Sequence, residues 1–236
     1  MSPNTQIGFM IVLSMYLHST MTTADAGTIL QPVSAVASDE RVFGTLHYMD
    51  DALVDQSGLV DRDTRQPNGY VSGVTDFDTY IASGPVHIDT SNAIWATNAD
   101  VTTAIIDFDL GGQFTIDGMA LWNRGNNLDN QIGNFELFAD DNNAFTSPVI
   151  IGSYLADGNL GDSLFTGVEV FRFTATTASH IRMSITSNLH WNGSGILSAG
   201  EVAFRQANSI PEPATGFLIV TGSASILAFF RRWKSR

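Results

Sequence analysis

The stretch IIDFDLGGQFTIDGMALWN, residues 105–123, carries the pattern that recurs through most of the chain. Ile106, Phe108 and Leu110 alternate with two aspartates before the pair Gly111–Gly112. Successive side chains of a β-strand point to opposite faces, so a period of two predicts a strand that is buried on one face and wet on the other. The glycine pair predicts a turn, with a second strand following it.

The same alternation recurs in short segments as far as residue 205. It is clearest where Ile181, Met183 and Ile185 alternate with polar residues. Further strands are predicted at 115–122, 134–139, 149–154, 168–173 and 201–205, separated by polar turns at 125–127, 140–143, 157–159 and 192–193. No segment shows a convincing amphipathic helix, and residues 61–92 are the least patterned, which predicts a long loop or insertion. The sequence therefore predicts an all-β sandwich or jelly roll.

Charge and cysteine usage limit the chemistry of the region between residues 27 and 209. It holds seven arginines, no lysine and 22 acidic residues, a formal net charge of −15. Such a surface repels nucleic acid and anionic lipid, and it suits an extracellular protein or a cation binder. The chain has no cysteine. Disulfides, thiolate nucleophiles and thiolate metal sites are therefore excluded.

The first 26 residues have the features of a secretory signal peptide. An uncharged apolar run at 7–17 is followed by the small-residue sequence Ala24-Asp25-Ala26, which predicts cleavage before Gly27. Neither lysine nor arginine precedes the apolar run, so a short N-terminal membrane anchor is the alternative.

The last residues predict a membrane-spanning helix that ends in a cationic stop. Residues 214–230 carry no charge and would span about 26 Å as a helix, just enough to cross a bilayer. Four cations follow at 231, 232, 234 and 236, which keeps the C-terminus in the cytoplasm. A buried C-terminal helix of the globular domain is the alternative.

The tripeptide Pro211-Glu212-Pro213 stands just before this apolar run. The three parts in this order resemble the PEP-CTERM sorting signal of Gram-negative bacteria that secrete exopolysaccharide. The resemblance covers residues 210–236. It implies processing by exosortase, a membrane-embedded cysteine transpeptidase, and delivery to the cell surface or matrix. Arg231 and Arg232 would then hold the tail in the membrane until processing.

Three stretches serve as landmarks of a known fold: the one at 105–123, ASHIRMSI at 178–185 and SAGEVAF at 198–204. With them, residues 27–209 resemble the discoidin domain, also called the coagulation-factor type C or galactose-binding-like sandwich. Matching positions are Asp109, Leu110, Gly111, Ile181, Arg182, Glu201 and Phe204, and PVSAVASDE at 32–40 and Trp95 resemble the N-terminal part of the family. In this family the arginine is usually structural and pairs with a neighbouring acid.

Two tryptophans are candidates for stacking on a sugar ring. Trp122 is followed by Asn123, and Trp191 by Asn192, so each offers a flat apolar face beside a hydrogen-bonding amide. Both could instead pack in the core, which is the favoured interpretation for Trp122 at the end of an alternating strand. A glycan-binding module should carry an exposed aromatic among the loops at one end of the sandwich.

The discoidin resemblance also implies a structural Ca²⁺ site formed by Asp55 and Glu201. Calcium prefers six to eight hard oxygens, to which two carboxylates and several carbonyls would contribute. Gln56 stands where the family often has glycine. In the alternative, Asp55 only caps a turn and Glu201 pairs with an arginine such as Arg205 or Arg182.

Catalysis finds little support in the sequence. Residues 161–164 spell the GDSL nucleophile block, but they lie in mid-domain and no histidine has an aspartate three positions before it. The histidines are scattered without zinc-binding spacing. We therefore expect an exported, surface-sorted protein that binds extracellular polysaccharide and is not an enzyme. The alternative is a structural biofilm or adhesion protein without a specific small ligand, and an unrecognised hydrolase ranks third.

Overall fold

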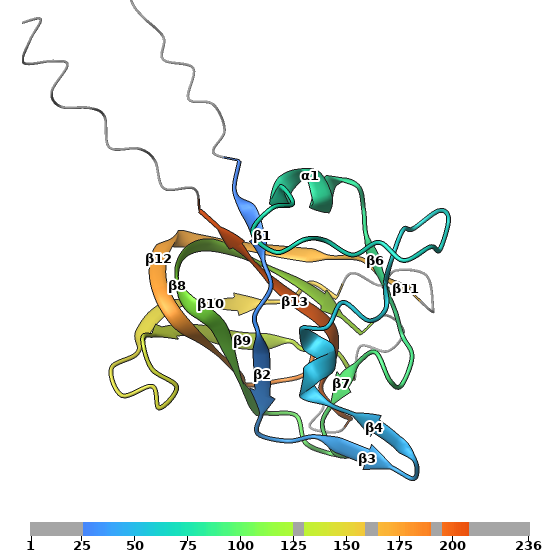
Figure 1. Cartoon of the computed structure of the whole chain (residues 1–236). Coiled ribbons are helices and arrows are strands. Elements are labelled where there is room, and N and C mark those ends of the chain that lie inside the picture. Colours follow the sequence, from blue (N-terminus) through green and yellow to red (C-terminus); the bar gives the residue numbers. More distant parts are fainter. Residues whose placement is uncertain (1–25, 125–129, 159–164, 190–194, 208–236) are drawn as a thin grey trace, which may run out of the picture.

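The computed structural model describes residues 26–124, 130–158, 165–189 and 195–207, which form a β-sandwich (Figure 1). The all-β prediction is thus confirmed. The elements are β1 (Thr28–Leu30), β2 (Ser34–Ala37), β3 (Arg41–Phe43), β4 (Leu46–Tyr48), a 3-10 helix η1 (Asp50–Leu53), β5 (Leu59–Val60), α1 (Phe77–Ala82), β6 (Val86–Ile88), β7 (Trp95–Ala96), β8 (Ala104–Asn123), β9 (Asn134–Asp140), β10 (Val149–Leu155), β11 (Phe165–Thr166), β12 (Glu169–Ile185) and β13 (Ser198–Gln206).

The expected signal peptide and sorting tail lie outside the described residues. Within the described ranges, no helix is long and apolar enough to cross a membrane.

Two long strands build the sandwich. β8 and β12 pair antiparallel along nearly their whole length, from Leu121 with Glu169 to Ala104 with Ile185. The first half of β8 also pairs with β2, and the second half of β12 pairs with β9, which in turn pairs with β10. The second half of β8 pairs with β13, and β13 pairs with β1. Both long strands arch over from one layer to the other (Figure 1). A single eight-stranded sheet is thereby folded into two layers.

The prediction of a turn at Gly111–Gly112 is wrong, because β8 continues through both glycines as a strand. The backbone bends there instead. Gly111 has a φ of +79°, and its N–H donates to the Asp109 carboxylate at 2.8 Å. Only glycine adopts such a φ without steric cost. The bend divides β8 into two halves, and each half lies in a different layer of the sandwich.

The interior is filled from both layers. Phe108 of β8 and Phe204 of β13 meet edge to face with ring centroids 5.7 Å apart, and both are fully buried. A second cluster covers the outer face of β8 and β13 and includes Phe77 and Tyr80 from the long insertion. The predicted insertion at 61–92 therefore packs as a lid on one layer.

This insertion also contains α1, a helix that the sequence analysis missed. Asp76 caps the first turn, accepting a hydrogen bond from the Thr79 N–H at 2.7 Å. Six residues are too few to display a 3.6-residue period, so only the Asp-x-x-Thr cap could have indicated the helix.

We expect Gly111→Ala to destabilise the domain by about 1–2 kcal/mol, because a Cβ disfavours the positive φ of this residue. The added Cβ would also lie 2.7 Å from Val33 Cγ1. Thermal melts should then fall by roughly 2–8 °C. Gly112→Ala is the matched control, since its Cβ would meet nothing closer than Phe114 at 3.4 Å. Equal melting temperatures for the two variants would contradict the role assigned to the bend.

Candidate functional site

Trp122 lies in the core, and the sugar-stacking hypothesis for it is wrong. The side chain is fully buried, and its indole N–H donates to the Pro85 carbonyl at 3.2 Å. The ring of Tyr80 packs against it with a centroid separation of 6.5 Å. Trp122 holds the insertion against β8 and has no face available to a ligand.

Asn123 is also structural. It is buried, and its amide group donates to the Ile132 carbonyl and accepts from the Ile132 N–H at 2.8 and 2.9 Å. These two bonds tie the end of β8 to the start of the next described segment. Trp191, Asn192 and the GDSL block lie outside the described residues, so the sugar-binding hypothesis for Trp191 and Asn192 stays a prediction.

The structure brings the predicted calcium pair together. Glu201 is fully buried on β13, where it accepts hydrogen bonds from the Gln56 N–H at 2.9 Å and the Tyr70 hydroxyl at 3.2 Å. Burial raises the pKa of Glu201 well above its ordinary value, and the nearby charge of Asp55 raises it further. Both hydrogen-bond donors are neutral.

The alternative interpretation of this pair is half correct. Asp55 does cap a turn, since its carboxylate accepts from the Ser57 N–H at 2.7 Å. Glu201, however, forms no ion pair within the described part of the chain. Arg182 pairs with Asp107 through two contacts of 2.6 and 2.7 Å, as a structural arginine should. Arg205 pairs with acids at positions 78 and 117.

The calcium site stays a prediction, and the oxygens around Glu201 have the chemistry that it needs. The charge of Asp55 acts on the buried carboxyl group of Glu201, and Glu201 forms no ion pair with a described cationic side chain. A divalent cation would balance the negative charge of the two carboxylates. Its oxygen ligands would be Asp55, Glu201 and carbonyl groups of the turn at 55–57. His87 does not supply a positive charge, because burial lowers its pKa to about 4 and leaves the ring neutral. No group of three or more acidic or histidine side chains suited to a metal occurs among the described residues.

An exposed aromatic occurs on a hairpin that the sequence analysis did not single out. β3 and β4 pair with each other only, as a two-stranded sheet beside the sandwich (Figure 1). The register places Arg41 and Phe43 on one face, opposite Tyr48 and Leu46. Phe43 is 63% exposed, and the Arg41 guanidinium lies 5.3 Å from the centroid of its ring. Only the turn glycine, Gly44, between short runs that contain Phe43 and Tyr48, could have indicated this hairpin.

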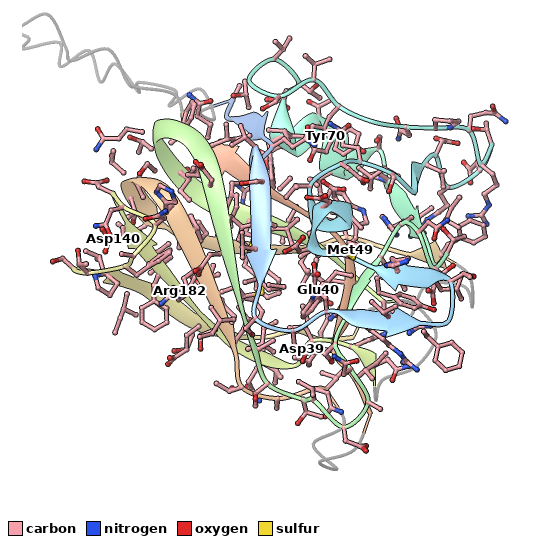
Figure 2. The ribbon with its side chains drawn as sticks, turned by 60° about the horizontal axis from the view of Figure 1, so that its bottom comes forward. Asp39, Glu40, Met49, Tyr70, Asp140 and Arg182 are labelled. Atoms are coloured by element: carbon pink, nitrogen blue, oxygen red, sulfur yellow. The ribbon has the colours of Figure 1, made fainter. Side chains whose placement is uncertain are left out.

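The base of this hairpin is firmly fixed to the core. The buried Trp95 donates its indole N–H to the Asp39 carbonyl at 2.9 Å, and the Asp39 carboxylate accepts from the Asn98 N–H at 2.6 Å. On the other side, Glu40 accepts from the Asp50 N–H at 2.8 Å. Figure 2 shows Asp39 and Glu40 between the sandwich and the hairpin, with Met49 nearby. The exposed Phe43 therefore stands on a rigid base.

A serine lies beside a histidine, an arrangement that a serine hydrolase would require. Ser179 Oγ lies 2.8 Å from His180 Nδ1, and His180 Nε2 lies 3.9 Å from an Asp109 carboxylate oxygen. At 3.9 Å the Asp109 carboxylate forms no hydrogen bond with the imidazole and does not orient it. The same Asp109 oxygen is already bonded to the Gly111 N–H. A serine without an oriented base is a weak nucleophile, so this group does not assemble a catalytic site.

In comparisons with known proteins, the chain is similar to a set of solved structures. No protein-family model matches the chain, and no curated protein matches it. A family 32 carbohydrate-binding module from Clostridium perfringens NanJ, in complex with galactose, is similar with a TM-score of 0.47 and 14% identity, over 76% of this chain and 98% of that one. A module from a family 31 glycoside hydrolase of the same organism has a TM-score of 0.48 and 14% identity, over 77% and 93%.

Chitosan-binding module 1 of a chitosanase/glucanase from Paenibacillus sp. IK-5 is similar with a TM-score of 0.45 and 17% identity, over 74% of this chain and 96% of that one.

We expect calcium to stabilise the domain. At a hundred times its Kd, an ion that binds only the folded state adds about 2.7 kcal/mol. Without the ion, stability should fall as pH rises above the ordinary glutamate pKa, because the folded state holds the proton of Glu201 more tightly than the unfolded chain does. Calcium should abolish that decline. Thermal melts with calcium and with chelator, from pH 4 to pH 8, measure both effects.

Glu201→Gln is the decisive variant, because it keeps the shape and removes the charge. It should lose the calcium response and be more stable than the chelated wild type at neutral pH. Coincident melts of the wild type with calcium and with chelator would exclude the ion.

Proposed function

We propose that this protein binds extracellular polysaccharide through the end of the sandwich that carries the β3–β4 hairpin. The observation that carries the proposal is the exposed ring of Phe43 on a base anchored to the core. A flat apolar ring held in place can stack on the apolar face of a sugar without losing much conformational freedom on binding. Most large apolar side chains of the domain are buried by comparison.

Polar groups beside the ring suit sugar hydroxyls. Arg41 makes no ion pair within the described part of the chain, and its guanidinium lies within 6 Å of the ring centroids of both Phe43 and Tyr48. It therefore keeps its hydrogen-bond donors for a ligand. The alternative function, a structural matrix or adhesion protein, would use the same hairpin as a contact between copies.

The export and sorting that we propose for this chain are based on the sequences of its two ends. We propose export by the signal peptide at 1–26 and sorting by the PEP-CTERM segment at 210–236, with exosortase as the processing partner. The tail would anchor the precursor in the membrane until processing. The mature protein would then reside at the cell surface or in the matrix of a Gram-negative bacterium.

Phe43→Ala should weaken glycan retention by roughly tenfold, about 1.4 kcal/mol, through loss of stacking. Its melting temperature should stay close to that of the wild type, since the side chain is largely exposed. Val42→Ala is the matched control, because Val42 is 57% exposed on the other face of the same hairpin. A glycan array followed by affinity electrophoresis on the glycans retained measures the difference.

Two results would contradict this proposal. An array that retains no glycan would favour the matrix function. Retained glycans with equal affinity for Phe43→Ala and the wild type would move the site away from the hairpin. Trp191→Ala, assayed in the same way, tests the other aromatic candidate.

Processing at the tail has its own test. Mature protein recovered from the cell surface should lack the peptide from Ala214 onward, which intact-mass measurement would detect. Changing Pro211, Glu212 and Pro213 to alanine should trap the precursor in the membrane. A permanently anchored protein would instead fractionate in the same way with and without these changes.

A further inference from the structure

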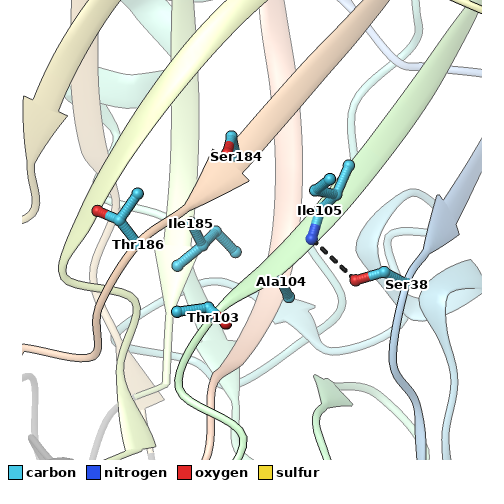
Figure 3. A pocket seen from close by; sticks show the side chains of 7 residues that line it. All are labelled: Ser38, Thr103, Ala104, Ile105, Ser184, Ile185 and Thr186. Atoms are coloured by element: carbon cyan, nitrogen blue, oxygen red, sulfur yellow. Dashed lines mark hydrogen bonds between the residues drawn. The ribbon is translucent and has the colours of Figure 1, made fainter.

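A shallow groove lies at the end of the sandwich where β8 begins and β12 ends, in the layer that also contains β9 and β10. Its volume is about 380 Å³, which falls within the range of small-ligand sites. The residues that line it are Ser38, Thr103, Ala104, Ile105, Ser184, Ile185 and Thr186. Figure 3 shows them converging from the end of β2, the start of β8 and the end of β12.

The chemistry of the lining is uniform. It contains four hydroxyl groups and no charged side chain. The side-chain hydroxyl groups of Thr103 and Ser184 make no hydrogen bond to any described residue, so both are available to a ligand. Ser38 Oγ accepts from the Ile105 N–H at 2.9 Å and can still donate its own proton. Ile105 is 39% exposed and gives the groove an apolar surface.

We propose that this groove is a second carbohydrate subsite, which holds a neutral sugar unit of the polysaccharide bound at the hairpin. Hydroxyls that both donate and accept, placed around an aliphatic side chain, match the hydroxyls and C–H faces of a hexose. A charged ligand would find no counter-charge in the lining. This inference rests on the proposed function, and it assigns a ligand to a face that neither Trp122 nor the predicted calcium pair occupies.

Two neighbouring features extend the groove into a path for a chain of sugars. On one side, Ser38 is three residues from Arg41, so the groove and the hairpin lie at most about 11 Å apart along the backbone. On the other side, the register places the Asp107–Arg182 pair two residues further along the same face. Its side chains are 27% and 29% exposed, which leaves them accessible to hydroxyl groups. An oligosaccharide could therefore contact the hairpin and the groove together.

Affinity electrophoresis in gels that contain dextran, laminarin or galactan, with alginate as the anionic counterpart, tests the groove. Thr103→Ala/Ser184→Ala should weaken binding to a neutral polysaccharide by roughly tenfold, through loss of two hydrogen bonds. Ser184→Trp should abolish the groove contribution by filling it. Ser153→Ala, an exposed serine on β10 of the same layer, is the matched control. Circular dichroism melts check that each variant is folded.

The outcomes separate the two proposals. Loss of retardation in the groove variants, with the control unchanged, supports the subsite. Groove variants that match the wild type, while Phe43→Ala weakens binding, would overturn the subsite and leave the proposed function intact. Retardation by alginate alone would also overturn the neutral subsite. No retardation in any gel, together with a glycan array that retains nothing, would overturn both.

Discussion

The antiparallel pairing of β8 with β12 is the constraint on which the rest of the sandwich depends. These two strands run side by side through both layers, so one pairing sets the register of the whole eight-stranded sheet. A slip of one residue in either strand would move the buried side chains of that strand to the solvent face. The bend at Gly111 and the register shifts in β12 allow the pair to change layer without separating. β8, β12 and the segments next to them therefore determine where the β3–β4 hairpin and the groove lie.

A buried carboxylate fixes the long insertion to this frame. Glu201 of β13 receives hydrogen bonds from the Gln56 N–H, which precedes the insertion, and from the Tyr70 hydroxyl within it. The ring of His87 packs close to the backbone of Gly58 and Gly200, where any larger residue would collide with it. Burial works against charge on both ionisable groups, since it raises the pKa of the glutamate and lowers that of the histidine. A charged Glu201 buried in this way lowers the stability of the folded state unless a cation binds beside it. The alternative is that Glu201 holds a proton. This is the physical basis for the predicted calcium site.

The surfaces proposed for ligand binding differ from the rest of this acidic domain. The hairpin presents an aromatic ring beside an arginine that has no acidic partner among the described residues, whereas Arg182 and Arg124 are each engaged by an aspartate. The groove has no charge at all. Strong net negative charge keeps such a protein soluble and disfavours anionic partners at long range. Local neutrality then leaves hydrogen bonding and stacking to decide what binds.

The sequence by itself determined the all-β class and the positions of most strands. These follow from local rules, because alternation of apolar and polar residues needs only the period of a strand. Tertiary structure decided the continuity of β8 through its glycine pair, the burial of Trp122 and the exposure of Phe43. Each of these depends on what a distant segment does: Asp109 and β12 hold the bend, the insertion covers Trp122, and nothing described covers the hairpin face of Phe43. Burial is a relation between segments far apart in the chain, so no local pattern could distinguish the buried tryptophan from the exposed phenylalanine.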